Sequence, residues 1–517
     1  MTDEKWKNKK AVSMIPKARN VIKNPTNEDL RAMAVEMPQA VKTNQDNFNI
    51  NTRVTARSAE STFFVSDVEM GQKRMPRKEY DAIARMQDEY ITANEMVLIE
   101  GAIGPDADFN VKCNLLIEKK NANIAAMQRQ LYFPLQGKSM QEMQVIYTPN
   151  LPAPGYPNDR VITVDLESFT TRVLGSDYFG ESKKGSLRMW NHIIYDAGGL
   201  ALHAGCKVYP DVNGSEKLIL IIGLSGTGKT TTTFRSQLNS LPVQDDFCAL
   251  FPGGQVRASE NGCFAKTIGL DRRYEPVIYD ALTSPDAWLE NVSVSTQGEI
   301  DFHDGSRTTN GRGTFEFGKI EHRSPSDLPR VSAILLLNRN LNIIPAVVKL
   351  KPEQAAAYFM LGETTGTSAG GASEAGKFLR VPGTNPFFCQ DHACQGNRFY
   401  DLLKTCEKMD VFLLNTGYVG GSENSTQSKK VAINDSSSIL EGIIQQTITW
   451  KEDDRFGYYI AESVPGITEA ELLQPALLYN CQGRGQEYNA LVEQISADRQ
   501  KYIQNYTDLY PVIKESI

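Results

Sequence analysis

An unbroken apolar run, LILII, occupies residues 218–222 and is followed at once by a glycine-rich loop. Apolar runs of this length without a turn residue are typical of buried β-strands. The stretch after the loop, TTTTFRSQL at residues 230–238, is compatible with a helix. The pattern therefore predicts a strand, a loop and a helix in direct succession, around which the rest of the chain is arranged.

Helical and strand-like periodicities alternate over the rest of the chain. Apolar residues at helical spacing predict helices at residues 27–37, 76–90, 185–203, 352–361, 399–406 and 488–503. Runs of β-branched and apolar residues predict strands at 96–104 and 113–118, with a turn at Pro105 between them, and at 160–166, 331–338, 343–350 and 410–415. Thr26 or Asn27 is expected to cap the first helix, and Thr468 with Glu471 to form a capping box. This mixture predicts an α/β fold with mixed α+β elements.

Composition and charge narrow the class of protein. A chain of 517 residues is long enough for two or three domains, and its hydrophobic content of 41% allows sizeable cores. With 55 basic and 62 acidic residues the net charge is −7, which argues against nucleic acid as a bulk partner. No run of 18 apolar residues occurs, and the start, MTDEKWKNKK, lacks the apolar segment of a signal peptide. We therefore expect a cytoplasmic protein with no membrane partner.

The eight cysteines are scattered along the chain, at a density far below that of a disulfide scaffold. Reduced thiols are expected. Cys389, His392 and Cys394 lie within six residues of one another, but no second pair stands nearby to complete four ligands. A metal site at this cluster is therefore not predicted.

The glycine-rich loop has the pattern of a phosphate-binding loop. Its sequence GLSGTGKT, residues 223–230, fills every fixed place of G-x-x-x-x-G-K-[ST]. Glycines let the backbone turn its N–H groups toward phosphate oxygens through dihedral angles that a Cβ forbids. Lys229 can reach the β and γ phosphates, and the Thr230 hydroxyl can bind Mg²⁺. A glycine-rich turn without a ligand is the alternative, but the flanking strand and helix favour a nucleotide site, made of Gly223, Leu224, Ser225, Gly226, Thr227, Gly228, Lys229, Thr230 and Thr231.

Two pairs of charged residues are further candidates. Asp245 and Asp246 follow the loop closely, Asp246 only 17 positions after Lys229 (246 − 229), which leaves room for one helix and one return strand. Carboxylate oxygens suit Mg²⁺ and Mn²⁺, so metal binding is at least as good a reading as a surface turn. Lys183 and Lys184 stand between two glycines; on their own, paired lysines are usually a solvated surface.

Further motifs follow one another along the chain: DYFGESKKG, ALHAG, GLSGTGKTT, QDD, FAKTI, YEPVIYD, LENVSV, IDFHDGSRTTNGR and NTGY. In this order they resemble the ATP-dependent phosphoenolpyruvate carboxykinase family, over residues 52–450 and most specifically over 177–312. The resemblance implies an N-terminal α/β substrate domain at 1–205 and a C-terminal P-loop nucleotide- and metal-binding domain with a mixed sheet at 206–517. It also implies conversion of oxaloacetate and ATP to phosphoenolpyruvate, ADP and CO₂, with Mg²⁺ and Mn²⁺ as cofactors.

The resemblance assigns substrate roles to five residues. Arg57 would hold a substrate carboxylate, and Arg312 would bridge the substrate and the γ-phosphate. Tyr178 would lie near the CO₂ position. Lys183 and Ser225 would help to neutralise the charge of the enolate and of the phosphoryl group.

The resemblance also assigns the metal and the remaining nucleotide positions. Lys184, His203 and Asp246 match ligands of the transition metal, and a lysine ligand must be neutral, so its pKa must be lowered. Thr230 would take the nucleotide-bound Mg²⁺. The other matched nucleotide positions are Lys266, Glu275, Arg312, Lys430 and Ser436.

The chain departs from the family pattern at several of these places. Phe247 and Cys248 replace a glutamate and a histidine, and SAEST replaces SPKDK after the substrate arginine. Lys430 replaces an arginine that contacts adenine in the family. A lysine ammonium group cannot stack on a base or form a bidentate contact as a guanidinium group does, so the nucleotide preference is left open. Two alternatives remain: a kinase of the same superfamily acting on a different carboxylate or a protein hydroxyl, and a non-catalytic nucleotide-binding regulator. Oligomeric state is also left open.

Overall fold

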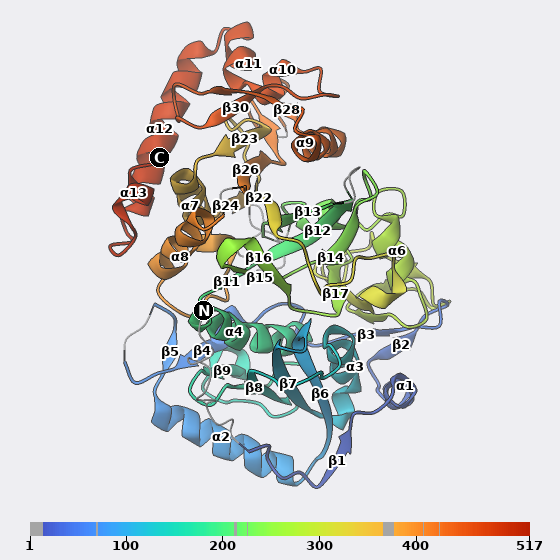
Figure 1. Ribbon diagram of the computed structural model, residues 1–517. Helices are drawn as coiled ribbons and strands as arrows, with labels where there is room; N and C mark the ends of the chain where they lie inside the picture. The colour runs from blue at the N-terminus through green and yellow to red at the C-terminus, as the bar shows by residue number, and fades with distance from the viewer. Residues whose placement is uncertain are drawn as a thin grey trace.

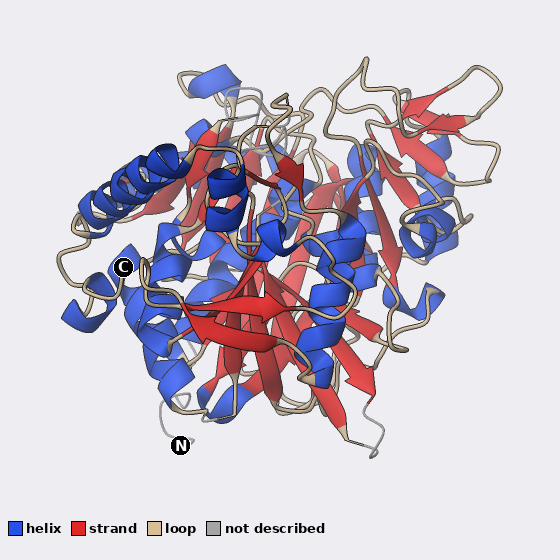
Figure 2. Cartoon of the chain, turned by 90° about the horizontal axis from the view of Figure 1, so that it is seen from above, coloured by secondary structure: helices blue, strands red, loops and turns tan. Residues whose placement is uncertain are grey.

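The computed structural model describes residues 14–68, 71–210, 215–224, 226–365, 377–406, 408–422 and 424–517. In Figure 1 the blue to cyan residues form the lower part of the molecule and the green to red residues the upper part. Seen from above in Figure 2, strands run through the middle and helices lie mostly toward the outside. Within the described ranges, no helix combines the length and the apolar character needed to cross a bilayer.

An eight-stranded mixed sheet forms the lower part of the molecule. Its strands lie in the order β1 (Asn20–Lys23), β6 (Glu95–Asp106), β7 (Phe109–Glu118), β8 (Gln141–Thr148), β10 (Thr170–Leu174), β9 (Val161–Asp165), β4 (Thr62–Val65) and β5 (Arg74–Met75). Strands β6 and β7 pair antiparallel, which confirms the predicted hairpin. Apolar residues of α3 (Ala122–Leu131) and α4 (Gly180–Asp196) share one core with this sheet.

A second eight-stranded sheet forms the centre of the upper part. Its order is β14 (Leu241–Gln244), β12 (Ala204–Pro210), β13 (Glu216–Ile222), β22 (Val331–Asn338), β26 (Asp410–Asn415), β23 (Val347–Leu350), β30 (Tyr459–Ser463) and β29 (Thr449–Glu452). Strand β13 confirms the predicted buried strand. Its alternate residues face two cores, one shared with α7 (Pro352–Leu361) and α8 (His392–Lys404), the other with α9 (Ile433–Gln445). Because both faces are covered, the buried part of the strand, residues 218–222, is entirely apolar.

A five-stranded sheet connects the start of the chain to its middle. Its order is β17 (Gly262–Lys266), β21 (Arg312–Glu316), β18 (Trp288–Glu290), β3 (Phe48–Ile50) and β2 (Ala40–Lys42), and β3 pairs parallel with β18. The smaller sheets are β11 (Leu200–Leu202) with β15 (Cys248–Phe251) and β16 (Gln255–Ala258), β19 (Ser293–Val294) with β20 (Ile300–Asp301), β24 (Glu363–Thr365) with β25 (Phe378–Arg380), and β27 (Tyr418–Val419) with β28 (Lys429–Lys430).

The predicted helices are found with some changes at their ends. Thr26 caps α1 (Asn27–Val35) in a capping box with Asp29, as expected, and α7 has its predicted bounds. The other helices are α2 (Arg77–Thr92), α5 (Lys229–Phe234), α6 (Pro276–Leu282), α10 (Ala470–Leu473), α11 (Pro475–Cys481), α12 (Gly485–Ile503) and α13 (Pro511–Lys514). The capping box at Thr468 was wrong, because Glu469 precedes α10 at its N-cap and makes no side-chain cap bond. Helix α5 ends four residues earlier than the compatible run, at Phe234.

Helix α4 corrects a prediction that matters for function. It begins at Gly180 and ends at Asp196, so Lys183 and Lys184 lie inside the helix and not ahead of it. His203 is not at the end of this helix; it directly follows strand β11. A turn at Gly198, with φ of 87°, separates the helix from the strand. As a result, the lysines and the histidine reach the upper part of the molecule from two different elements.

Candidate active site

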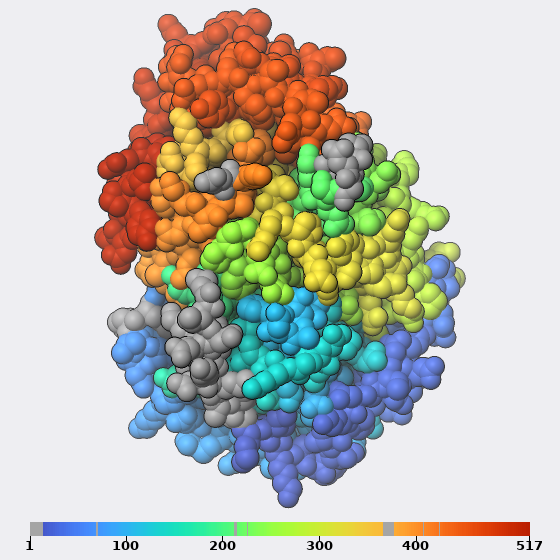
Figure 3. All heavy atoms as spheres, in the orientation of Figure 1, coloured from blue at the N-terminus to red at the C-terminus, as the bar shows by residue number. Residues whose placement is uncertain are grey.

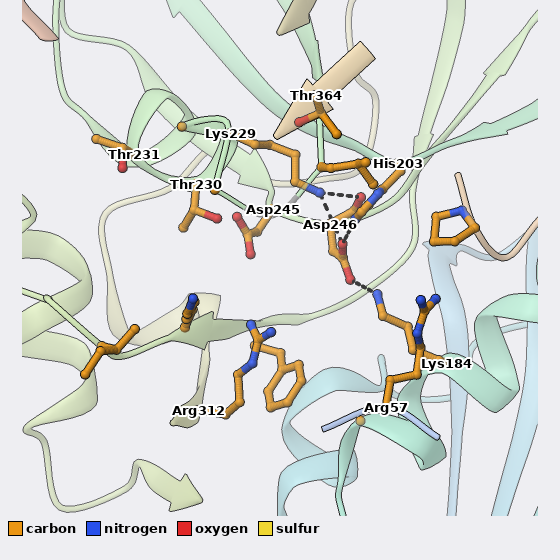
Figure 4. Close-up of a pocket in the computed structure, with 18 of the residues that line it drawn as sticks. Arg57, Lys184, His203, Lys229, Thr230, Thr231, Asp245, Asp246, Arg312 and Thr364 are labelled. Atoms are coloured by element: carbon orange, nitrogen blue, oxygen red, sulfur yellow. Dashed lines mark hydrogen bonds and ion pairs between the residues drawn. The ribbon is translucent and has the colours of Figure 1, made fainter. Parts of the chain in front are cut away.

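One cavity of 510 Å³ lies between the start of α4, the loop after β13 and the five-stranded sheet (Figure 4). It brings together residues separated by more than half of the chain. The predicted site residues that line it are Arg57, Tyr178, Lys184, His203, Leu224, Gly226, Gly228, Lys229, Thr230, Thr231, Asp246, Lys266, Glu275 and Arg312. Strands β13, β22 and β26 are parallel, and the glycine-rich loop leaves β13 at its C-terminal end, which is the usual ligand-binding edge of such sheets.

The glycine-rich loop contains three positions that favour glycine, two through their backbone angles and one through lack of space. Gly226 and Gly228 have φ of 90° and 93°, in the left-handed region. A Cβ on Gly223 would come within 2.5 Å of the Thr227 hydroxyl, which itself donates to the carbonyl of Leu224 at 2.8 Å. Gly223 and Thr227 thus support the loop from outside the cavity. Ser225 lies outside the described residues.

Asp246 is the centre of the charged wall in Figure 4. It follows β14, as the short return after the loop predicted. Its carboxylate pairs with Lys184 and lies 3.1 Å from Lys183 Nζ, 3.2 Å from Lys229 Nζ and 2.8 Å from His203 Nε2. Burial alone would raise the pKa of Asp246, but the three lysines lower it well below its ordinary value. Asp246 is therefore ionised whenever the protein is folded near neutral pH.

The two adjacent lysines of α4 have different environments. Burial lowers the pKa of Lys184 to about 8, which makes its neutral amine available near neutral pH. Lys183 is also buried, but the carboxylates of Glu260 and Asp246 more than offset this, and its pKa is raised. Lys183 pairs with Glu260 behind the cavity wall and does not line the cavity. Lys183 thus remains a cation under conditions in which Lys184 can lose its proton.

His203 is oriented by a contact on its other nitrogen. Nδ1 lies 2.9 Å from the carbonyl oxygen of Thr384, which can only accept, so Nδ1 carries the proton in the neutral ring. Burial lowers the pKa of His203 to about 4, so the ring is neutral at pH 7. Its Nε2 lone pair then faces an acceptor oxygen of Asp246. Two facing acceptors at this distance are satisfied by a shared proton or by a metal cation, and imidazole nitrogen with carboxylate oxygen suits a divalent metal.

The opposite wall of the cavity also carries cations. In Figure 4, Arg57 and Arg312 lie across the cavity from Asp246 and Lys229. The Arg57 guanidinium carbon is 5.5 Å from the ring centre of Phe387, and Arg312 begins β21, directly opposite Lys266 in β17. Such a wall suits a ligand with several negative charges.

A sequence model of the family described as phosphoenolpyruvate carboxykinase matches residues 19–470. The chain belongs to this family. A protein named phosphoenolpyruvate carboxykinase (ATP) from Aeropyrum pernix is 32% identical over 431 residues, which cover 81% of this chain and 82% of that protein. Proteins of the same name from Afipia carboxidovorans and a Chelativorans species are 29% and 30% identical, over 72% and 65% of this chain and 70% and 62% of their own lengths.

Two matched positions of this carboxykinase family do not reach the cavity. Lys430 is exposed on β28, and Ser436 donates to the carbonyl of Ala432 within α9, at 3.3 Å. Neither residue lines the cavity. By contrast, Glu275 accepts a hydrogen bond from Thr231 at 2.7 Å at the cavity edge.

Several residues of this carboxykinase site were not found from the sequence. Phe247, at the position of the family glutamate, is fully buried and stacks on His203 with ring centres 4.9 Å apart. Phe387 lies 4.7 Å from Lys184 Nζ as well as beside Arg57. The repeated aromatics after Pro386 were the only sequence signal for Phe387, whereas Glu260 and Thr364 had none. In the described part of the chain, no three residues among His, Cys, Asp and Glu gather as a metal site, and Cys389 Sγ donates instead to the carbonyl of Arg188.

Proposed function

We propose that this chain is an ATP-dependent phosphoenolpyruvate carboxykinase, which converts oxaloacetate and ATP to phosphoenolpyruvate, ADP and CO₂. The observation that carries the proposal is the convergence of Arg57, Arg312, Lys184, His203 and Asp246 beside the phosphate loop in one cavity. A decarboxylating kinase needs positive charge facing both a dicarboxylate and a triphosphate, and both walls of the cavity supply it. Family membership and the ATP-dependent name of the relatives support the same reaction.

In this proposal residues 1–205 form the substrate domain and residues 206–517 the P-loop nucleotide- and metal-binding domain. Arg57 and the start of α4 come from the first part, whereas the loop after β13 comes from the second. The cavity lies where the two parts meet, and the enolate formed there must be kept from water. This placement explains why residues of both parts are needed.

The nucleotide and the metal ions would be held by residues of suitable chemistry. Backbone N–H groups of the loop and Lys229 would hold the phosphates, and Thr230 the Mg²⁺. Glu275, Lys266 and Leu224 would contact the rest of the nucleotide. Lys184, His203 and Asp246 would hold Mn²⁺, a set supported by the neutral imidazole that faces a carboxylate. When bound, the two cations neutralise charge on the enolate oxygen and on the phosphates.

The remaining residues would act on the substrate. Arg57 holds one carboxylate, while Tyr178 lies beside the carboxylate that leaves as CO₂. The electron pair of the broken C–C bond moves to the carbonyl oxygen of oxaloacetate, and this enolate oxygen takes the γ-phosphoryl group of ATP. Arg312, Lys183 and Ser225 offset the negative charge during that transfer.

The test is an assay of purified protein with oxaloacetate, ATP, Mg²⁺ and Mn²⁺, with phosphoenolpyruvate measured by coupled oxidation of NADH. Formation of phosphoenolpyruvate that depends on both substrates and both metals is the expected result. Turnover of nucleotide with another acid or with a protein hydroxyl, and none with oxaloacetate, would identify a different kinase. Tight ATP binding with no transfer to any acceptor would identify a regulator. GTP is included as a second donor, because the site leaves the base preference open.

A further inference from the structure

Thr364 presents a buried hydroxyl to the cavity without a role in the proposed chemistry. The residue is 1% exposed, lines the cavity, and its Oγ1 has no hydrogen-bond partner among the residues that the structure describes. Figure 4 draws it on the same side of the cavity as Lys229 and His203. A buried donor without a partner is costly unless a ligand satisfies it.

A short hairpin places Thr364 there. Strand β24 pairs antiparallel with β25, so that Thr364 lies opposite Leu379, another residue of the cavity wall. The hairpin is closed at its base by a hydrogen bond from Val381 N–H to the Gly362 carbonyl, at 3.0 Å. Successive side chains of a strand point to opposite sides. Thr364 therefore faces the cavity while Glu363 faces away from it.

Glu363 is held from behind by helix α12. Arg499 binds both of its carboxylate oxygens, at 2.9 and 2.6 Å, and donates to the Tyr358 hydroxyl at 3.0 Å. Arg380 donates to the same carboxylate at 3.0 Å. Glu363 and Arg499 are almost fully buried, at 4% and 1% exposure. This bidentate contact fixes the direction of β24, and its arginine lies beyond residue 470, where the family match ends.

We infer that Thr364 is a further ligand-contacting residue, whose hydroxyl donates a hydrogen bond to the terminal phosphate of a bound nucleoside triphosphate, and that Arg499 is a positioning residue for it through Glu363. The inference rests on the proposed nucleotide use of the cavity. The terminal phosphate is the matching group, because Lys229 on the same side is the residue that reaches it and phosphate oxygens only accept.

The test compares Thr364→Val, which removes the hydroxyl with little change of shape, with Thr364→Ser, which keeps it. Binding of ATP and of ADP, each with Mg²⁺, is measured by calorimetry, and the thermal midpoint is measured without nucleotide. In Thr364→Val we expect ATP affinity to fall about tenfold, ADP affinity to fall much less, and the midpoint to stay unchanged or rise. Thr364→Ser should bind ATP nearly as the original chain does.

Equal ATP affinity in the original chain and Thr364→Val, with ATP bound by both, would overturn the contact and leave the proposed function standing. A lower midpoint in Thr364→Val with unchanged affinity would mean that the hydroxyl serves the fold. No ATP binding by the original chain would overturn both the contact and the proposed function.

The positioning role of Arg499 is tested by comparing the affinities for ATP and ADP of Arg499→Met and Arg499→Lys. Arg499→Met should lose the preference for ATP over ADP in the same direction as Thr364→Val, and the lysine variant should recover part of it. If Arg499→Met lowers only the thermal midpoint and keeps the ATP-to-ADP affinity ratio, Arg499 is structural and the positioning role is wrong.

Discussion

Among the residues that the structure describes, we compare two buried clusters in which several cations surround a carboxylate, because they differ in what lies around them. Around Asp246, Lys183, Lys184 and Lys229 crowd one carboxylate at the cavity wall. Around Glu363, two arginines bind one carboxylate, and the group is closed off by the helix α12, which runs along the outer side of the upper part in Figure 3.

The difference lies in how the charges are balanced. At Asp246 two of the three lysines, Lys184 and Lys229, line a cavity that anions can enter, whereas Lys183 also pairs with Glu260. At Glu363 the bonds are bidentate and the partners are fixed by neighbouring aromatic rings, Tyr358 and Tyr502. Lysine N–H groups that face a cavity can still bind an anionic ligand, whereas the Arg499–Glu363 contact is bidentate and Arg380 has a second partner in Asp498. The Asp246 cluster is thus arranged to bind ligands, and the Glu363 cluster to stabilise the cavity wall that β24 forms.

The largest effect that this comparison predicts is the loss of activity in Asp246→Asn. The amide cannot offset three lysines or serve as an anionic metal ligand, so we expect carboxykinase activity to fall roughly 10³-fold. The measurement is kcat/KM for oxaloacetate. The control is Asp165→Asn, which removes a buried carboxylate that pairs with Arg77 at 2.7 Å far from the cavity. This control should lower the unfolding midpoint and leave the kcat of the folded protein unchanged. Equal losses of activity in both variants would mean that Asp246 has no special role in the reaction.

The second prediction concerns stability at the Glu363 cluster. Arg499→Met leaves a buried carboxylate with one arginine in place of two, so we expect a loss of the order of 3 kcal/mol in the free energy of unfolding. Urea unfolding followed by circular dichroism measures it. The double variant Arg499→Met with Glu363→Gln should recover part of this loss, because it removes the unbalanced charge. A double variant less stable than the single one would mean that packing, and not charge, holds α12 in place.

The third prediction is a pH dependence that belongs to the Asp246 cluster alone. In the proposed metal site Lys184 binds the metal as a neutral amine, and its pKa is about 8, whereas His203, with a pKa of about 4, is already neutral. Mn²⁺ affinity should therefore rise up to about tenfold per pH unit from about pH 6 and level off above about pH 8. Electron paramagnetic resonance of free Mn²⁺ measures it. In Lys184→Met we expect a weaker Mn²⁺ affinity that does not change with pH. If the affinity of this variant still rises with pH, the proton that competes with the metal belongs to another group.

The same shift has a consequence for stability in the metal-free protein. The pKa of Lys184 is lower in the folded state than its ordinary value of 10.5, so the unfolded chain holds more protons between about pH 8 and 10.5. The contribution of Lys184 to stability therefore rises with pH across that window. The pKa of Glu363 is lowered and that of Arg499 is raised, so neither group titrates in this window.

The two clusters also differ in how far the sequence could predict them. The phosphate loop and Asp246 were found because their chemistry is contiguous or separated by one short helix and one strand. Lys184 and His203 were found only by resemblance, and the bounds of α4 were wrong around both. Local pattern placed the buried strand β13, since both of its faces are apolar.

The supporting contacts could not be predicted, because they join distant parts of the chain. Arg499 and Glu363 are 136 residues apart, and His203 and Thr384 are 181 apart. An arginine on a polar helix and a glutamate before a threonine carry no local signal of burial. Only the folded chain shows that these charged residues are inside.

The smallest predicted effect lies at the border of the nucleotide site, where resemblance and placement disagree. The resemblance treats Lys430 and Lys266 alike, as nucleotide positions, but only Lys266 lines the cavity. Lys430→Ala should therefore change the KM for ATP less than about twofold, as exposed substitutions away from a site usually do. Lys266→Ala, the matched control, should raise it about tenfold through loss of a charged contact. If Lys430→Ala instead has the larger effect, the nucleotide base lies against β28, and the nucleotide site extends beyond the walls of this cavity.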